Sequence, residues 1–228
     1  MSSQTPAPSS WRDTTIRDML TADRLDSYLT ASGGDLGKAL ALYEWNTRVS
    51  GAVMQTVAMA EVLVRNALDR RLVAWAASRP SASTWLDTAP LDGRGKADIA
   101  AARDRATNQG RLPESHGKVV SELSFGFWRY LVASRYLTTL WLPALSRAFP
   151  NGDKNVTARQ PQVERLMADV GFIRNRAAHH RPLHRRNLGR DYAAVVTLCG
   201  WLDTEAGAWV AAQSTLPSVA AERSRIGV

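Results

Sequence analysis

Residues 171–190, the basic segment, bring together residue types that could act on a phosphate. The segment contains six arginines, three of the four histidines and no Asp or Glu: Arg174, Arg176, Arg181, Arg185, Arg186, Arg190, His179, His180 and His184. Arginine binds phosphate oxygens through a planar set of donors, and imidazole exchanges a proton near neutral pH. The combination favours binding and cleavage of a phosphodiester.

A solvated helix end is the plain alternative for this segment. Basic side chains are stabilised near the C-terminus of a helix, and Pro182 is a common helix stop. A run of charge alone fits that interpretation. Three histidines among the arginines favour a functional site instead.

Spacing adds detail to the functional interpretation. Asn175 and His179 are four residues apart, so they share one face of a helix. Arg174 precedes His179 by five residues, about 140° around an ideal helix. Its long side chain must therefore wrap towards the other two, unless the helix loosens before Pro182.

Helical periodicity runs through the rest of the chain, and strand alternation is absent from the pattern. The strongest apolar repeat follows Asp35, a predicted N-cap, and continues to about residue 78. Gly51 is a point where this helix could bend or split. Further helices are expected over 14–31, 93–107, 121–149, from about 161, and over 189–212. The sequence thus predicts an all-α bundle of about five to seven helices, in one domain over 14–212, between a disordered lead-in (1–13) and a flexible tail (213–228).

Composition indicates the class of partner. The chain has 228 residues and a formal net charge of +8. Such an excess favours a polyanion, with nucleic acid ahead of an anionic membrane. The single cysteine, Cys199, excludes an intramolecular disulfide and is expected to pack as a small apolar side chain. With no signal-peptide pattern in residues 1–10 and no apolar span, a cytoplasmic protein is expected.

Four stretches carry a resemblance to a known family. Residues 174–179 (RNRAAH) resemble the R-N-x-x-x-H signature of the HEPN superfamily, which includes many metal-independent endoribonucleases. Together with 42–46 (LYEWN), 61–67 (EVLVRNA) and 123–128 (LSFGFW), in that order, they resemble the Abi-like abortive-infection family within it. These four matched stretches lie within about residues 23–190, and residues 80–118 match nothing in the family.

The resemblance implies a helical homodimer in which two signatures face each other across a cleft, with no cofactor and no metal. The RNA 2′-hydroxyl would attack the adjacent phosphorus. His179 would act as general acid or base, Arg174 would stabilise transition-state charge, and Asn175 would orient His179 or the phosphate.

Other residues are expected to support this site. Glu61 and Arg65 are spaced for a helical ion pair; they either form an ordinary surface pair or steady Arg174 or His179. Asn66 and His180 are further supporting candidates. His180 and His184 have metal-ligand spacing, but no nearby carboxylate completes a site, so no metal is expected. The predicted RNA-binding residues are Arg176, Arg181, His184, Arg185, Arg186 and Arg190.

Two classes of function remain open at this point. One is an RNA endonuclease, a toxin that halts translation during phage infection and has an antitoxin partner in some systems. The other is a non-catalytic HEPN-type module that binds RNA or a protein through the same basic patch. A membrane-surface role is disfavoured, because large apolar residues do not interleave with the arginines.

Overall fold

The computed structural model of the chain describes residues 11–79 and 84–228. Over these residues all regular secondary structure is helical, which confirms the predicted all-α class. The α-helices are α1 (Asp13–Leu20), α2 (Ala22–Ala31), α3 (Leu36–Ala77), α4 (Trp85–Thr88), α5 (Gly93–Ala106), α6 (His116–Glu122), α7 (Phe125–Leu131), α8 (Val156–Ala178), α9 (Leu188–Leu202), α10 (Thr204–Gln213) and α11 (Leu216–Ala221). Short 3₁₀ or π segments cover Ser134–Tyr136, Leu137–Trp141, Leu145–Ala148 and Glu222–Ile226.

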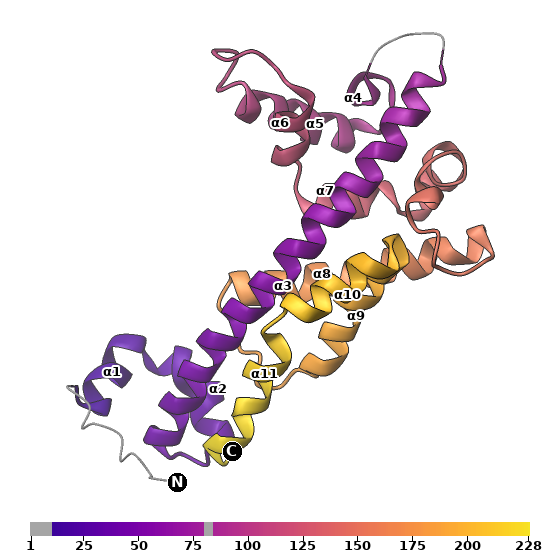
Figure 1. The fold of residues 1–228 in the computed structure, drawn as a ribbon. Coiled ribbons are helices and arrows are strands. Elements are labelled where there is room, and N and C mark those ends of the chain that lie inside the picture. Colours follow the sequence, from indigo (N-terminus) through magenta and orange to yellow (C-terminus); the bar gives the residue numbers. More distant parts are fainter. Residues whose placement is uncertain (1–10, 80–83) are drawn as a thin grey trace.

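Helix α3 is the axis around which the other elements pack. It has 42 residues, a length of about 63 Å at the usual helical rise. As predicted, Asp35 caps it, accepting a hydrogen bond from Lys38 N at 3.0 Å. Gly51 does not interrupt it. Figure 1 shows α1 and α2 at one end of α3, α4–α6 towards the other, and α8–α11 along its side.

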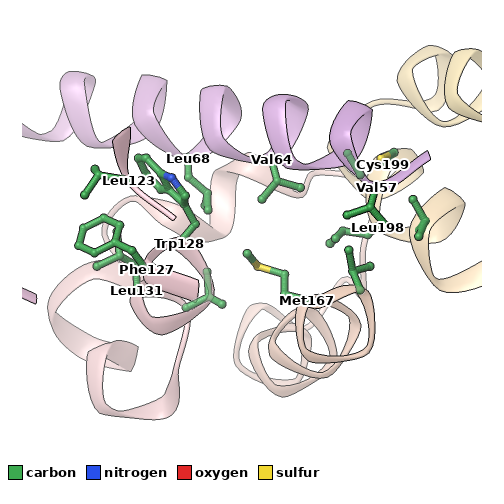
Figure 2. Close-up of a cluster of buried hydrophobic side chains, with 14 of the residues drawn as sticks. Val57, Val64, Leu68, Leu123, Phe127, Trp128, Leu131, Met167, Leu198 and Cys199 are labelled. Atoms are coloured by element: carbon green, nitrogen blue, oxygen red, sulfur yellow. The ribbon is translucent and has the colours of Figure 1, made fainter. Parts of the chain in front are cut away.

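The core follows the apolar face of α3. Figure 2 shows side chains of α3 above three groups, one around α7, one on α8 and one on α9. The labelled residues are Val57, Val64, Leu68, Leu123, Phe127, Trp128, Leu131, Met167, Leu198 and Cys199. Cys199 is fully buried, as predicted, and burial raises the pKa of its thiol to about 12. This packing fixes α7 and α8 against the middle of α3.

Residues 84–118, which have no counterpart among the matched stretches, are attached to α3 through Asp69. Its Oδ1 accepts a hydrogen bond from Trp85 Nε1 at 2.7 Å and lies 2.8 Å from His116 Nε2. Trp85 is fully buried and stacks near Phe127 of α7. The segment therefore extends the core of α3 and α7.

The described residues form eleven α-helices, more than the five to seven predicted. Two expected helices are each divided by one residue. Thr21, with φ of 70°, separates α1 from α2, and Asp203 separates α9 from α10. The Asp203 side chain accepts from Glu205 N at 2.8 Å, so it caps a new helix where the sequence predicted a continuous one.

The continuous helix predicted over 121–149 is wrong. Ser124 caps α7 by accepting from Phe127 N at 3.2 Å, and the chain after Leu131 turns through short 3₁₀ and π segments. Leu140 and Leu145 are nevertheless fully buried. Apolar spacing predicted which residues are inside, but it did not distinguish one helix from several connected turns.

Helix α8 begins earlier than the predicted start near residue 161. The side chain of Asn155 accepts from Thr157 N and Ala158 N, both at 3.0 Å, so the helix starts at Val156. Pro161 therefore lies inside α8 instead of at its first position.

The prediction of a flexible tail over 213–228 needs correction. Most of these residues form helical structure that packs on α3. Leu216 is 3% exposed, and the buried indole of Trp45 donates from Nε1 to Val219 O at 2.8 Å. Thr56 Oγ1 also lies 2.7 Å from Ser214 Oγ. The tail thus supplies the acceptor for the buried indole N–H of Trp45 and a further contact for Thr56. Of the predicted lead-in, residues 1–10 lie outside the described residues, and Asp13 already belongs to α1.

Replacement of Leu216 by Ala tests whether the C-terminal residues belong to the core. We expect Leu216→Ala to lower the free energy of unfolding by about 3 kcal/mol, because it leaves a cavity at a buried position. The matched control is Leu142→Ala, since Leu142 is 42% exposed. Urea unfolding measures both; equal, small losses would show that the tail does not stabilise the fold.

Candidate functional site

A pocket of about 780 Å³ lies between α3, the α6–α7 junction and α8. We call it the site pocket. Its lining residues are Glu61, Arg65, Ser121, Glu122, Leu123, Ser124, Phe125, Gly126, Trp128, Arg129, Ala168, Gly171, Phe172, Arg174 and Asn175. Three of the four matched stretches, 61–67, 123–128 and 174–179, thus contribute to one cavity although they are far apart in the sequence.

Local structure explains how the pocket walls come together. The Ser124 cap turns the chain between α6 and α7, which places Phe125 against α8. At Gly171 of α8, an added Cβ would lie 3.8 Å from the Phe125 ring. Behind this contact, Phe127 and Trp128 pack into the core below α3, as Figure 2 shows. The base of the pocket is therefore formed by side chains that belong to the packed core.

Glu61 of α3 and Arg174 of α8 are in contact in the pocket wall. Arg174 Nε lies 3.5 Å from Glu61 Oε1, an ion pair without hydrogen-bond geometry. Burial raises the pKa of Glu61, while Arg174 and then Arg65 act to lower it. Glu61 thus pairs with Arg174 of α8, not with Arg65 of its own helix. This places Glu61 beside the predicted catalytic arginine, in a position to hold it.

Asn175 continues the polar wall beside Arg174. Its Oδ1 accepts from Arg174 Nη1 at 3.3 Å. On α3, Arg65 Nε similarly donates to Asn66 Oδ1 at 3.4 Å. Arg174 and Asn175 therefore both line the pocket, whereas Asn66 is linked to it through Arg65.

Two guanidiniums of the pocket have no carboxylate partner. Within the described residues, no Asp or Glu oxygen lies within 4.0 Å of Arg65 or Arg129 in an ion pair. Glu122, the second acid of the lining, is paired with Arg105 at 3.0 Å. The cavity thus presents unpaired positive charge that an anion could neutralise.

His179 lies outside the pocket lining. Helix α8 ends at Ala178, and His179 is its C-cap, with N–H bonded to Asn175 O at 3.0 Å. The next residue, His180, adopts a left-handed φ of 52°. Both imidazoles are exposed. Asn175 and His179 are thus joined by a backbone hydrogen bond, but their side chains do not meet in the pocket as the predicted shared helical face would require. The imidazole of His179 is exposed to solvent at the helix end.

The structure places His184 inside the fold, not on the RNA-facing surface predicted for it. The residue is 2% exposed, and its ring centroid lies 5.0 Å from that of Tyr28. Burial, followed by the charge of Arg185, lowers the pKa of His184. Next to it, Leu183 N donates to Asn46 Oδ1 at 2.6 Å. The matched stretch 42–46 thus anchors the basic segment to α3.

The arginines of the basic segment divide into internal and free groups. Arg186 pairs with Asp191, which is 3% exposed, and Arg176 Nη2 donates to Pro182 O at 2.6 Å. Arg190 lies 4.0 Å from Asp169. Arg181 and Arg185 are exposed. Of the predicted RNA-binding residues, Arg181 and Arg185 are exposed without an ion pair in the described residues, whereas Arg186 is paired with a buried carboxylate.

Metal ligation gains no support from the placement of the histidines. His180 and His184 do not share a helix, and one is exposed while the other is buried. In the described residues, no three His, Cys, Asp or Glu side chains gather in a way that would hold a metal ion. No helix in that part of the chain has the length and apolar character needed to cross a membrane.

Comparison with protein-family models, with curated proteins and with solved structures gave no significant match. The resemblance to the HEPN superfamily therefore depends on the four matched stretches and their order.

The pocket residues that the sequence reasoning missed include Arg129 and Phe172. Arg129 directly follows the matched stretch 123–128, and Phe172 lies two residues before the signature. Both have the residue type that binds nucleotides, but their direction depends on how α7 and α8 face α3. Proximity to a matched stretch was the one signal that could have found them.

Arg185 and Arg186 form a matched pair for testing the internal role of Arg186. We expect Arg186→Ala to lower the free energy of unfolding by about 2 kcal/mol, because buried Asp191 loses its partner while water screens part of the effect. Arg185→Ala should change it by less than about 0.5 kcal/mol. Urea unfolding distinguishes them, and equal effects would reject the internal role.

Glu61→Gln tests the electrostatics of the pocket. Because burial raises the pKa of Glu61, the folded protein binds that proton more tightly than the unfolded chain does. The free energy of unfolding of the wild type should therefore fall as pH rises above about 4.5. In Glu61→Gln this fall should be smaller, whereas the exposed control Glu205→Gln should keep it. Thermal unfolding across the acidic range measures the difference; identical profiles for all three proteins would contradict the assignment.

Proposed function

We propose that this protein is a metal-independent endoribonuclease of the HEPN type. The observation that carries the proposal is the meeting of Arg174 and Asn175 with Glu61, Arg65 and the α6–α7 junction in the site pocket. The stretches that resemble the family therefore form a shared cavity lined by guanidiniums. Such a cavity has the chemistry to bind a phosphodiester.

The proposed reaction uses the substrate's own nucleophile. A base removes the proton of the RNA 2′-hydroxyl, whose oxygen attacks the adjacent phosphorus. The bond from phosphorus to the 5′-oxygen breaks, and an acid protonates that oxygen. The products are a 2′,3′-cyclic phosphate and a 5′-hydroxyl. Arg174 stabilises charge on the phosphoryl oxygens, Asn175 orients the phosphate, and His179 exchanges the proton.

A homodimer would give His179 its place in this reaction. The imidazole is exposed at the end of α8, one turn beyond Asn175 and outside the pocket lining of its own chain. In a two-fold pair with the signatures facing each other, each chain supplies one His179 to a shared cleft. One imidazole then serves as base and the other as acid.

The biological setting follows from the family resemblance. We propose a cytoplasmic toxin that acts in abortive-infection phage defence, cuts cellular RNA, and is restrained by an antitoxin where its system encodes one. The net charge of +8 favours RNA as the substrate. The defence role is proposed from the resemblance alone, and the net charge supports only the binding of a polyanion.

A non-catalytic module that binds RNA or protein is the second candidate. It is favoured by the pairing of Arg174 with Glu61 and by the position of His179 outside the pocket. In that case the arginines would hold an RNA or an acidic protein surface without cutting it. Product chemistry separates the two candidates.

The test is incubation of total bacterial RNA with the purified protein in excess EDTA. We expect discrete new fragments that end in 2′,3′-cyclic phosphate. His179→Ala should reduce cleavage by about 100-fold or more, the usual effect of losing a general acid or base. Sequencing of the new ends measures both the extent and the position of cleavage.

Arg71→Gln is the control, because Arg71 is an exposed basic side chain of α3 that does not line the site pocket. This variant should cleave RNA as the wild type does. Circular dichroism should show the same helicity in all three proteins. Absence of cleavage, with RNA bound equally by wild type and His179→Ala, would reject the nuclease in favour of the binding module.

A further inference from the structure

Phe172 is a large apolar side chain that the fold leaves at the rim of the site pocket. It lines the pocket and is 49% exposed, although it lies on α8 between buried Val170 and Ile173. Exposing a phenyl ring forgoes the free energy of burying it. Its position at the pocket rim, within the basic segment, makes it available to a flat ligand.

The guanidiniums of two arginines make cation–π contacts with the Phe172 ring. The Cζ atoms of Arg186 and Arg176 lie 4.9 and 5.8 Å from the ring centroid. Both arginines are fixed by other contacts, Arg186 by Asp191 and Arg176 by the carbonyl of Pro182. The ring therefore has a defined orientation and does not need to be ordered when a ligand binds.

Other lining residues of the same pocket supply unpaired positive charge. Arg65 on α3 and Arg129 on α7 line the cavity, and neither has a carboxylate partner in the described part of the chain. Arg174, by contrast, is paired with Glu61. An anion entering the pocket meets two guanidiniums, Arg65 and Arg129, that no carboxylate already occupies.

We propose that the site pocket binds one unpaired nucleotide of single-stranded RNA, with its base stacked on Phe172 and its flanking phosphates on Arg65 and Arg129. A flat ring beside two free guanidiniums matches a ligand that combines a planar base with phosphate charge. The proposal builds on the proposed function, because it takes RNA as the polyanion. It adds the substrate class and the three residues that would select it.

Double-stranded RNA does not fit this arrangement. In a duplex the base faces are covered by their neighbours, and proteins contact mainly phosphates and 2′-hydroxyls. Phe172 would then have no base to stack on. Single strands expose base faces, and stacking of a base on an aromatic side chain contributes about 1–3 kcal/mol. The pocket should therefore discriminate between single and double strands through Phe172.

Binding is tested in the His179→Ala background, so that RNA is not consumed. The probes are a fluorescein-labelled oligoadenylate, its duplex with oligouridylate, and an abasic oligoribophosphate of equal length, followed by fluorescence anisotropy in EDTA. The single strand should bind about tenfold more tightly than the other two. Phe172→Ala should weaken that binding about tenfold, and Phe172→Trp should retain it.

Trp209→Ala is the matched control for Phe172→Ala, because Trp209 is also an aromatic side chain that is 49% exposed but lies outside the pocket. It should leave binding unchanged. Arg129→Gln should weaken binding and reduce the slope of log Kd against log salt by about 0.7, the value for one phosphate contact on a single strand. Arg71→Gln, on α3 outside the pocket, should leave that slope unchanged.

The outcomes separate this inference from the nuclease. Equal binding of single strand and duplex, no effect of Phe172→Ala, or no binding of any probe would overturn the nucleotide pocket. If RNA is cut in EDTA regardless of Phe172, the nuclease stands without this pocket. If binding depends on Phe172 and no RNA is cut, the pocket stands and the nuclease is rejected.

Discussion

Burial of the apolar face of α3 is the constraint on which the rest of the structure depends. A helix of 42 residues cannot bury that face by itself, so α2, α7, α8, α9 and α11 must all pack against it. The core is continuous from Leu25 and Tyr28 near one end to Leu72 and Trp75 near the other. Because α7 and α8 pack beside each other along this face, the α6–α7 junction and the end of α8 meet over Glu61 and Arg65. The site pocket is thus a consequence of how α3 is covered.

The arginines of the basic segment differ in ways that its sequence does not separate. Arg186 is paired with buried Asp191, and Arg176 ties the loop after α8 to the helix by donating to the Pro182 carbonyl. Arg181 and Arg185 remain exposed. Folding therefore uses part of the charge that composition alone assigned to a partner. The free charge of the pocket comes instead from α3 and α7, through Arg65 and Arg129.

The pocket combines one guanidinium in an ion pair with a carboxylate, that of Arg174, and two guanidiniums without one, those of Arg65 and Arg129. Arg174 is balanced by Glu61, whose raised pKa reflects a carboxylate that burial disfavours in its ionised form. An incoming phosphate would compete with Glu61 for Arg174, whereas neither Arg65 nor Arg129 is in an ion pair within the described residues. Such an arrangement suits a ligand with more than one phosphate. A single strand of RNA has that property, and its bases are free to contact Phe172.

Much of this protein could be predicted from its sequence, for physical reasons that are local. Periodicity gave the all-α class and α3, because a helix repeats its buried face every three or four residues whatever surrounds it; Asp35 was recognisable because a cap acts on its own helix. The resemblance in residues 174–179 drew attention to Arg174 and Asn175, and both line the site pocket. Other features required the tertiary structure. The breaks at Ser124 and Asp203, the packing of Leu216 and the burial of His184 depend on contacts between distant segments. So do the choice of Arg174 as the partner of Glu61 and the exposure of Phe172 beside Arg129, because ion pairs and pockets form between elements that only the packing around α3 brings together.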